Sequence, residues 1–146
     1  MMKIGITNDH AGLKMKKRIC KYLLKKGYEV INYGTNTKES VDYPDMAKKL
    51  TDAILSGDVE YGIAICNTGI GISIACNRVK GIRCAKAHDI REAKLTRIDN
   101  NANVLAFSAH MPFYKVKDII DVFLTTDFSN MERHKRRIEK LDKLSK

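Results

Sequence analysis

The sequence predicts an α/β protein: one Rossmann-like domain over residues 1–146, in which a five-stranded parallel sheet lies between two helical layers. Strand-like and helix-like segments alternate about every 20 to 25 residues, which is typical of parallel sheets with helical crossovers. Residues 61–66 (YGIAIC) show no polar alternation, which predicts a central strand buried on both faces. The sequence shows no internal repeat and no linker rich in Pro, Gly or Ser, which favours a single three-layer α/β/α sandwich.

The first two strands are expected at residues 3–8 and 28–33, with a helix at 12–26 between them. Apolar side chains of the helical segment recur at helical spacing on one face, and lysines fill the other face. The apolar positions are Leu13, Ile19, Tyr22 and Leu23. Gly27 ends this helix, because glycine readily adopts the conformation needed just past a last helical turn.

The middle of the chain continues the alternation. A second helix should begin at Pro44, after the polar and irregular segment 35–43, and end at Gly57. The central strand at 61–66 is followed by a glycine-containing turn and a short helix of small residues that ends near Asn77. The remaining elements are strands at 82–86 and 103–107 and helices at 89–98, 112–124 and 131–144.

Composition indicates a globular protein. Hydrophobic residues make up 44% and charged residues 30%, which is too apolar for a disordered chain. No run reaches the roughly 18 to 20 apolar residues that cross a bilayer, so we expect no membrane contact. The first residues enter a strand directly, so we expect no signal peptide. The four cysteines form no CxxC pair, which argues against a zinc ribbon or disulfide framework and favours a cytoplasmic location; they are Cys20, Cys66, Cys76 and Cys84.

The formal net charge of +10 raises the question of nucleic acid binding. Residues 1–30 carry eight basic and two acidic side chains, and residues 132–146 carry seven and three. Residues 31–131 carry twelve of each, so the excess charge lies in two terminal, helix-like segments. Aromatic residues make up only 7%, Trp is absent, and no aromatics interleave with the basic tail. A basic nucleic-acid-binding protein is therefore a less favoured alternative.

The strongest local signal for chemistry is Cys66, which ends the central strand and precedes Asn-Thr-Gly-Ile-Gly. Gly69 and Gly71 let backbone N–H groups approach a ligand closely. The positive end of the following helix favours an anion there and favours the thiolate form of Cys66. These residues offer a base or nucleophile beside an anion-binding nest. A structural turn with a buried cysteine explains them equally well.

Two further groups of polar residues are candidates for ligand contact. After the first strand, Asp9 either accepts sugar hydroxyls or caps a helix, and His10 can donate to a phosphate or a ring oxygen. Near the end of the chain, Arg133 and Arg137 share one helix face, an arrangement that suits a phosphate but is more often a solvated face. Neither a GxGxxG fingerprint nor a Walker loop is present.

The order of these motifs along nearly the whole chain makes the sequence resemble ribose-5-phosphate isomerase type B. That isomerase belongs to the family that also holds the galactose-6-phosphate isomerase subunits. The segments that carry the resemblance are Asp9-His10, Asp42-Tyr43-Pro44, Gly62 to Cys66, Thr68 to Ala75, Asn77, Gly81-Ile82-Arg83, Asn103 to Phe107, and Arg133-His134 with Arg137. The family interconverts aldose and ketose phosphates without a metal or organic cofactor. The resemblance thus implies a cofactor-free aldose–ketose isomerase.

The resemblance also implies a role for each matching residue. Ribose 5-phosphate and ribulose 5-phosphate, of the pentose phosphate pathway, would interconvert through an enediolate with Cys66 as base. The residues that match the anion hole are Thr68, Gly69, Ile70 and Gly71. The residues that match sugar or phosphate contacts are Asp9, His10, Asn100, Arg133 and Arg137. The family's pocket lies between two subunits, which implies a homodimer, open to further pairing into a tetramer, with the C-terminal helix extending to the partner.

Three positions depart from the family pattern. Asp99 stands where an acid histidine is expected, and an ionised carboxylate is a poor proton donor, although it can relay a proton as a base. We prefer His10 as the group that opens the sugar ring, with His88 as an alternative. Asn67 replaces a glycine and narrows or polarises the pocket, and His110 stands where an arginine commonly holds the phosphate. Allose or galactose 6-phosphate therefore remains the alternative substrate.

Overall fold

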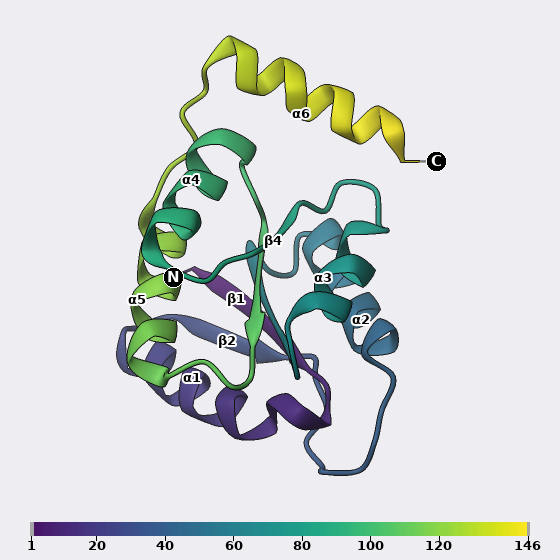
Figure 1. The fold of residues 1–146 in the computed structure, drawn as a ribbon, viewed down its shortest axis with the longest axis vertical. Helices are drawn as coiled ribbons and strands as arrows, with labels where there is room; N and C mark the ends of the chain where they lie inside the picture. The colour runs from purple at the N-terminus through teal and green to yellow at the C-terminus, as the bar shows by residue number, and fades with distance from the viewer. Residues whose placement is uncertain (1, 146) are drawn as a thin grey trace.

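The structure is a computed structural model that describes residues 2–145. Within these residues, five strands form one parallel sheet in the order β2-β1-β3-β5-β4 (Figure 1). The strands are β1 (Lys3–Asn8), β2 (Glu29–Asn32), β3 (Tyr61–Cys66), β4 (Cys84–Lys86) and β5 (Val104–Ser108). The helices are α1 (Leu13–Lys25), α2 (Tyr43–Ser56), α3 (Ile70–Asn77), α4 (Ile90–Asn100), α5 (Phe113–Thr125) and α6 (Glu132–Leu144), and a 3-10 turn, η1 (His10–Gly12), follows β1. The predicted α/β class and parallel sheet are confirmed.

Two helical layers enclose the sheet (Figure 1). Helices α1, α4 and α5 pack on one face, and α2 and α3 pack on the other. The central strand β3 supplies both halves of the core, because Ile63 and Ile65 are buried with the first layer and Ala64 and Cys66 with the second. A strand covered on both faces keeps apolar side chains at successive positions. This burial explains why residues 61–66 lack alternation.

The direction in which strands are added to the sheet reverses between β1 and β3. From β1 the chain moves outward to β2, and it then crosses back to β3 on the other side of β1. Such a reversal opens a crevice at the carboxyl ends of the two strands, where α/β proteins commonly bind ligands. Asp9 follows β1 and Asn67 follows β3, so both predicted ligand segments begin at this crevice.

Two element boundaries differ from the sequence prediction by two residues, and the others differ by at most one. Strand β4 begins at Cys84 rather than at residue 82, because Arg83 is bonded to a side chain: its backbone N–H donates to Asn103 Oδ1 at 2.8 Å. Helix α4 runs two residues further than predicted, and it ends where Asn101 adopts a left-handed conformation with φ of 46°. Both differences lie at the end of the sheet away from the crevice.

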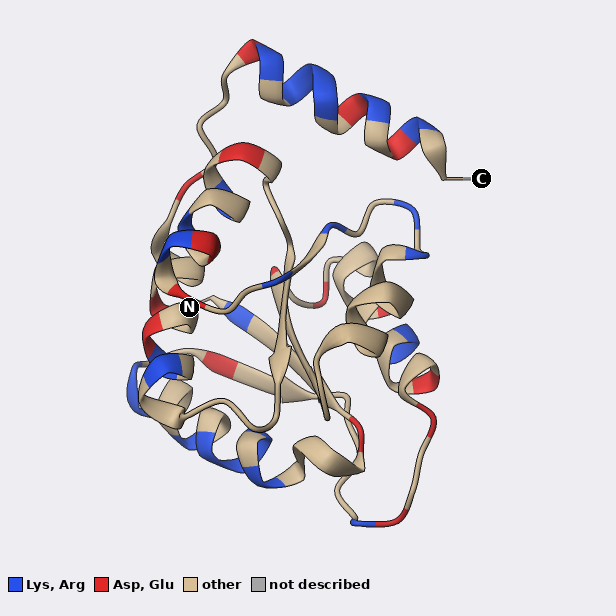
Figure 2. Cartoon of the chain, in the orientation of Figure 1, with Lys and Arg blue, Asp and Glu red and all other residues tan. Residues whose placement is uncertain are grey.

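Helix α6 lies apart from both layers, beyond the amino ends of the strands (Figure 1). The loop before α6 is bonded to α4, since the Ser129 N–H donates to the Ile98 carbonyl at 3.3 Å. Lys and Arg residues are concentrated along α1 and α6 (Figure 2), in agreement with the charge of the two terminal segments. Within residues 2–145, no helix has both the length and the apolar character needed to span a membrane.

Candidate active site

The turn after β3 holds the Cys66 thiol against the start of α3. Cys66 is 5% exposed, and its Sγ accepts the Gly69 backbone N–H at 3.2 Å. Thr68 is exposed, and its Oγ1 accepts the Ile70 N–H at 3.1 Å. The first N–H groups of a helix have no partner within the helix and carry its positive end. The structure therefore brings the thiol, the Thr68 hydroxyl and the predicted nest together.

Gly69 is required by the shape of this turn. Its φ of 79° lies in the left-handed region, which side chains with a Cβ adopt only at a cost. A Cβ at Gly69 would also meet the carbonyl of Phe107 on β5. The neighbouring strand β5 therefore limits the path that the turn can take.

Asp9 and His10 lie beside this turn, at the end of β1. Asp9 is 7% exposed, and its Oδ1 accepts the Ala11 N–H at 3.0 Å, so it caps η1 as the sequence allowed. His10 Nδ1 accepts the Val41 N–H at 3.2 Å, so we assign the ring proton to Nε2. His10 lines a cavity of about 520 Å³ together with Ala11, Leu13, Lys14, Lys17 and Lys38.

Asn67 and His110, two of the three departures from the family pattern, contact each other. His110 Nε2 and Asn67 Oδ1 are 2.6 Å apart. Ser108 joins the same contact, because its Oγ donates to the Asn67 carbonyl at 2.7 Å and accepts the His110 N–H at 3.1 Å. The loop after β5 is thereby fastened to the Cys66 turn. The His110 Nε2 faces Asn67, and phosphate binding by His110 stays a prediction.

Four predicted site residues lie elsewhere. Asp99 and Asn100 end α4, and Arg133 and Arg137 are exposed on α6, beyond the amino ends of the strands. Helix α4 has 11 residues, so at a rise of 1.5 Å per residue its two ends are about 16 Å apart. Within one copy of the chain these four residues therefore lie at the opposite end of the sheet from Cys66 (Figure 1).

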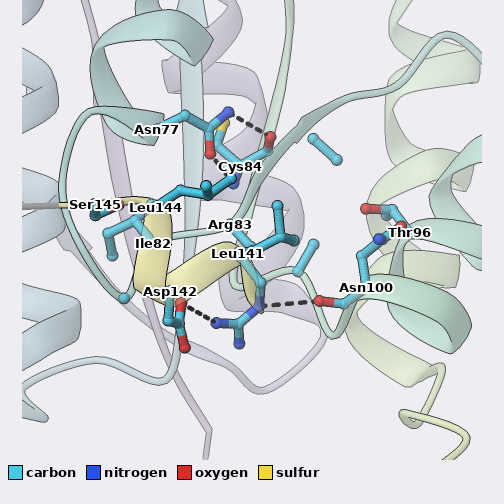
Figure 3. A pocket seen from close by; sticks show the side chains of 13 residues that line it. Asn77, Ile82, Arg83, Cys84, Thr96, Asn100, Leu141, Asp142, Leu144 and Ser145 are labelled. Carbon is cyan, nitrogen blue, oxygen red and sulfur yellow. Dashed lines mark hydrogen bonds and ion pairs between the residues drawn. The ribbon is translucent and has the colours of Figure 1, made fainter. Parts of the chain in front are cut away.

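The opposite end of the sheet has its own polar contacts, and Figure 3 shows those around Arg83. Asp99 Oδ1 lies 3.5 Å from His134 Nε2. Arg83 Nε donates to the Asn100 carbonyl at 2.9 Å, and Arg83 Nη1 lies 3.8 Å from Asp142 Oδ1. Burial lowers the pKa of the Arg83 guanidinium. Arg83, Asn100 and Asp142 line a cavity of about 410 Å³ beneath the C-terminal part of α6.

Lys16 contradicts the prediction that the lysines of α1 face solvent. It is 3% exposed, and its Nζ donates to Asn32 Oδ1 at 3.2 Å, to Asn36 Oδ1 at 2.8 Å and to the Thr35 carbonyl. Burial lowers the pKa of Lys16. The side chain fixes the loop after β2 next to β1, where Asn8 Nδ2 also donates to the Thr35 carbonyl at 3.3 Å. Helical periodicity alone carries no signal for such a contact.

Tyr43 and His134 are two more residues whose positions the sequence did not indicate. A Cβ at Gly71 would lie 2.8 Å from Tyr43 Cζ, so the ring covers the first turn of α3. His134 is 7% exposed on a helix that is otherwise half-buried or exposed. The motifs Asp42-Tyr43-Pro44 and Arg133-His134 contain both residues, but neither the contact of Tyr43 with α3 nor the burial of His134 can be read from the motifs.

Both the sequence and the fold of the chain are similar to those of known proteins. The ribose/galactose isomerase family matches residues 4–141. The solved structure of ribose-5-phosphate isomerase B from Clostridium thermocellum superposes with a TM-score of 0.95 at 44% identity, covering 98% of this chain and 97% of that one. Ribose-5-phosphate isomerase B of Escherichia coli is 39% identical over 140 residues, which are 95% of this chain and 93% of that protein.

A relative that is named for a different sugar phosphate also matches the chain. The galactose-6-phosphate isomerase subunit LacB of Clostridium acetobutylicum is 35% identical over 144 residues, which are 98% of this chain and 83% of that protein. The family match covers all five strands except Lys3 of β1, and it covers the greater part of α6. The chain therefore belongs to the ribose/galactose isomerase family.

Proposed function

We propose that the chain is a cofactor-free aldose–ketose isomerase that interconverts ribose 5-phosphate and ribulose 5-phosphate. The observation that carries this proposal is the buried Cys66 Sγ, which ends β3 at the crevice and lies 3.2 Å from the Gly69 nitrogen. The ribose-5-phosphate isomerases B among the relatives support the choice of a five-carbon sugar. Asp9 and His10 at the end of β1 supply contacts for the sugar hydroxyls.

The proposed isomerisation moves a proton between C2 and C1 of the open-chain sugar. Cys66, as thiolate, takes the C2 proton, the electrons of that bond form the C1=C2 double bond, and O1 takes the negative charge. The Thr68 hydroxyl and the Gly71 N–H stabilise the oxyanion, together with the N–H groups at Gly69 and Ile70, which donate to Cys66 Sγ and Thr68 Oγ1 before the sugar binds. Cys66 then returns the proton to C1 while the O2 proton passes to O1, which gives the ketose.

We propose that a second copy of the chain supplies the phosphate ligands. Arg133 and Arg137 suit a phosphate, because each guanidinium can donate two parallel hydrogen bonds, yet they lie at the opposite end of the sheet from Cys66 in the same copy. Apolar side chains are exposed next to the Cys66 turn, where a partner would cover them. These are Tyr43 at 39%, Ile70 at 53% and Ile74 at 55% exposure. A homodimer whose α6 reaches the partner's crevice accounts for both observations.

A six-carbon sugar phosphate is the alternative substrate. The observations that favour it are the carboxylate at position 99 and the contact between Asn67 and His110, which place side chains foreign to the family pattern at both halves of the proposed site. A galactose-6-phosphate isomerase subunit among the relatives supports this alternative. Allose 6-phosphate and galactose 6-phosphate are the substrates to compare with ribose 5-phosphate.

A coupled assay of the purified protein tests the proposal. Ribose 5-phosphate should turn over faster than allose 6-phosphate or galactose 6-phosphate, and Cys66→Ala should lower that rate by at least about a hundredfold. Cys20→Ala is the matched control, because Cys20 is half-buried in α1 and away from the crevice. Turnover that survives Cys66→Ala would remove Cys66 as the base. A preference for a six-carbon substrate would select the alternative.

A further inference from the structure

Lys16 is a buried cation whose hydrogen bonds are made to oxygen atoms of uncharged groups. The residue is 3% exposed, and its Nζ donates to Asn32 Oδ1 at 3.2 Å, to Asn36 Oδ1 at 2.8 Å and to the Thr35 carbonyl. An ammonium group has three N–H donors, so these three acceptors use all of them. Burial lowers the pKa of Lys16, so the three bonds offset the loss of water around the charge. The proposed isomerisation does not use this group.

The acceptors of this ammonium group lie at the end of β2 and the start of loop 33–42, which joins β2 to α2. The Thr35 carbonyl also accepts Asn8 Nδ2 at 3.3 Å, and the Thr35 N–H donates to the Asn8 carbonyl at 3.3 Å. Gly34 passes so close to β1 that a Cβ on it would overlap Oδ1 of Asn8. The start of the loop is therefore clamped between α1 and the carboxyl end of β1, next to the crevice.

The far end of the same loop contacts His10. The Val41 N–H donates to His10 Nδ1 at 3.2 Å, which leaves the ring proton on Nε2. Lys38, from the middle of the loop, lines the cavity of about 520 Å³ that His10 also lines. Residues 36–40 are exposed, so apolar packing does little to hold this part of the loop in place. The position of Val41 therefore depends on how the two ends of the loop are held.

We propose that Lys16 is a positioning residue for His10, an inference that rests on the proposed function. The ammonium group fixes residues 32–36 against β1, and the loop then carries the Val41 N–H to His10 Nδ1. The ring keeps one tautomer and one orientation, in which its Nε2–H can donate to an oxygen of the sugar. Lys16 is too deeply buried to touch the sugar itself.

A purely structural role is the competing explanation. In that case Lys16 would only stabilise the contact between α1 and the loop, and the start of α2 would hold Val41 in place without it. Loss of Lys16 would then lower the free energy of unfolding and leave the His10 ring unchanged. The two explanations differ in the state of one imidazole ring, which can be measured with and without catalysis.

The tautomer of His10 gives the first test. At about pH 8, where imidazole groups are mostly neutral, the nitrogen NMR spectrum of histidine-labelled protein shows which ring nitrogen carries the proton. The wild type should show His10 protonated at Nε2, and Lys16→Met should move part of the population to the Nδ1 form. His10→Ala assigns the signal. Lys21→Met is the matched control, because Lys21 is exposed on the same helix, and its spectrum should match that of the wild type.

A double-mutant cycle with His10 gives the second test. Lys16→Met should lower kcat/KM for ribose 5-phosphate by about tenfold, since it leaves the loop acceptors without their donor. If Lys16 acts through His10, the kcat/KM of the double variant Lys16→Met/His10→Ala should lie within about twofold of that of His10→Ala alone. Lys16→Arg, which keeps the charge and the N–H donors, should recover part of the rate.

Asn36→Ala provides the same test if Lys16→Met does not fold. Asn36 is exposed, so this variant removes one acceptor of the ammonium group at little risk to the fold. It should lower kcat/KM by about threefold and shift the His10 tautomer in the same direction. An unchanged His10 spectrum in the folded variants, or kinetic losses that add in the double variant, would overturn the inference. A wild type that converts no phosphosugar would overturn the proposed function alone, because the His10 spectrum still tests the part played by Lys16.

Discussion

The backbone of Gly69 lies so close to the backbone of Phe107 that a Cβ on Gly69 would be 2.6 Å from the Phe107 carbonyl carbon. Phe107 belongs to β5, which pairs with β3 and carries no proposed catalytic group. Strand β5 thus shapes the turn in which the Gly69 N–H donates to the Cys66 Sγ. The turn is held by packing as well as by its hydrogen bonds.

Gly69→Ala should therefore disable the site and destabilise the fold. The new methyl group meets a backbone carbonyl that cannot move without disturbing β5, and φ of 79° adds backbone strain. We expect a loss of about 2–4 kcal/mol in the free energy of unfolding and a fall in kcat of at least about tenfold. Urea unfolding and steady-state kinetics measure the two effects.

Gly57→Ala is the matched control for that substitution. Gly57 has a similar φ of 85°, but nothing lies within 4 Å of the position that its Cβ would take. In this variant the free energy of unfolding should fall only by the cost of the left-handed backbone, about 1–2 kcal/mol, and the kinetics should be unchanged. Equal losses in the two variants would show that strain alone, and not the contact with Phe107, makes Gly69 necessary.

Mixing two impaired variants should restore activity if the site takes residues from two copies of the chain, provided that the substrate concentration is far below the raised KM of the Arg137→Ala variant. Cys66→Ala lacks the proposed base and Arg137→Ala lacks a phosphate ligand. In a mixed dimer one site carries both defects and the other carries neither. After unfolding and refolding an equimolar mixture, half of the dimers are mixed, so about a quarter of the wild-type rate should return.

The Arg137→Ala variant should also show a characteristic change in its kinetics. Arg137→Ala alone should chiefly raise KM for phosphorylated sugars, because it removes binding rather than proton transfer. The unmixed variants, refolded in the same way, are the controls for the mixture. A mixture no more active than the average of its two components would show that Cys66 and Arg137 of different copies do not form one site.

The sheet was predictable because its signals are local. The unbroken apolar run at 61–66 and the glycines that end α1 and α2 set β3 and two helices without reference to the rest of the chain. The Cys66 turn was predictable for the same reason, since the thiol, the glycines and the helix start lie within six residues. The start of β4 was missed because Asn103, 20 residues away, takes the Arg83 N–H.

What the sequence could not indicate depends on contacts between distant segments. Lys16 fits the charged face of α1 by periodicity, and only the loop after β2 makes it a buried donor. His134 reads as one more polar residue of a basic helix, and only Asp99, 35 positions earlier, gives it a partner. The placement of Arg133 and Arg137 at the opposite end of the sheet from Cys66 follows from the length of α4 and the path of the loop before α6.

Stability should fall in alkaline solution, with Cys84 as one cause. The hydrogen bond with Cys76, together with burial, raises the pKa of the Cys84 thiol well above 9.0. Above pH 9.0 the unfolded chain releases this proton while the folded chain keeps it, so the free energy of unfolding decreases as pH rises. One retained proton gives a slope of at most about 1.4 kcal/mol per pH unit.

Thermal unfolding of the wild type and Cys84→Ala, compared between about pH 8 and about pH 10, measures this slope. The variant should be less stable at the lower pH but should lose less stability across the interval. Lys16 works in the opposite direction, because burial lowers its pKa and its charged form is disfavoured in the folded state. Parallel curves for the two proteins would show that Cys84 does not contribute to the alkaline loss.

The last prediction concerns the contact between His110 and Asn67. It tests whether His110 fastens the Cys66 turn or binds phosphate. At 2.6 Å the His110 Nε2 and Asn67 Oδ1 form a close polar contact that joins the loop after β5 to the turn. If fastening is its role, Asn67→Ala and His110→Ala remove the same interaction. The double variant should then lose no more kcat/KM than either single variant, with a coupling energy of about 0.5–1.5 kcal/mol.

The double-mutant cycle distinguishes the two roles because phosphate binding needs no help from Asn67. A His110 that held the phosphate directly would raise KM by the same factor whether residue 67 is Asn or Ala, so the two losses in kcat/KM would add. Additive losses would assign His110 to the phosphate, and coupled losses assign it, with Asn67 and Ser108, to the positioning of Cys66.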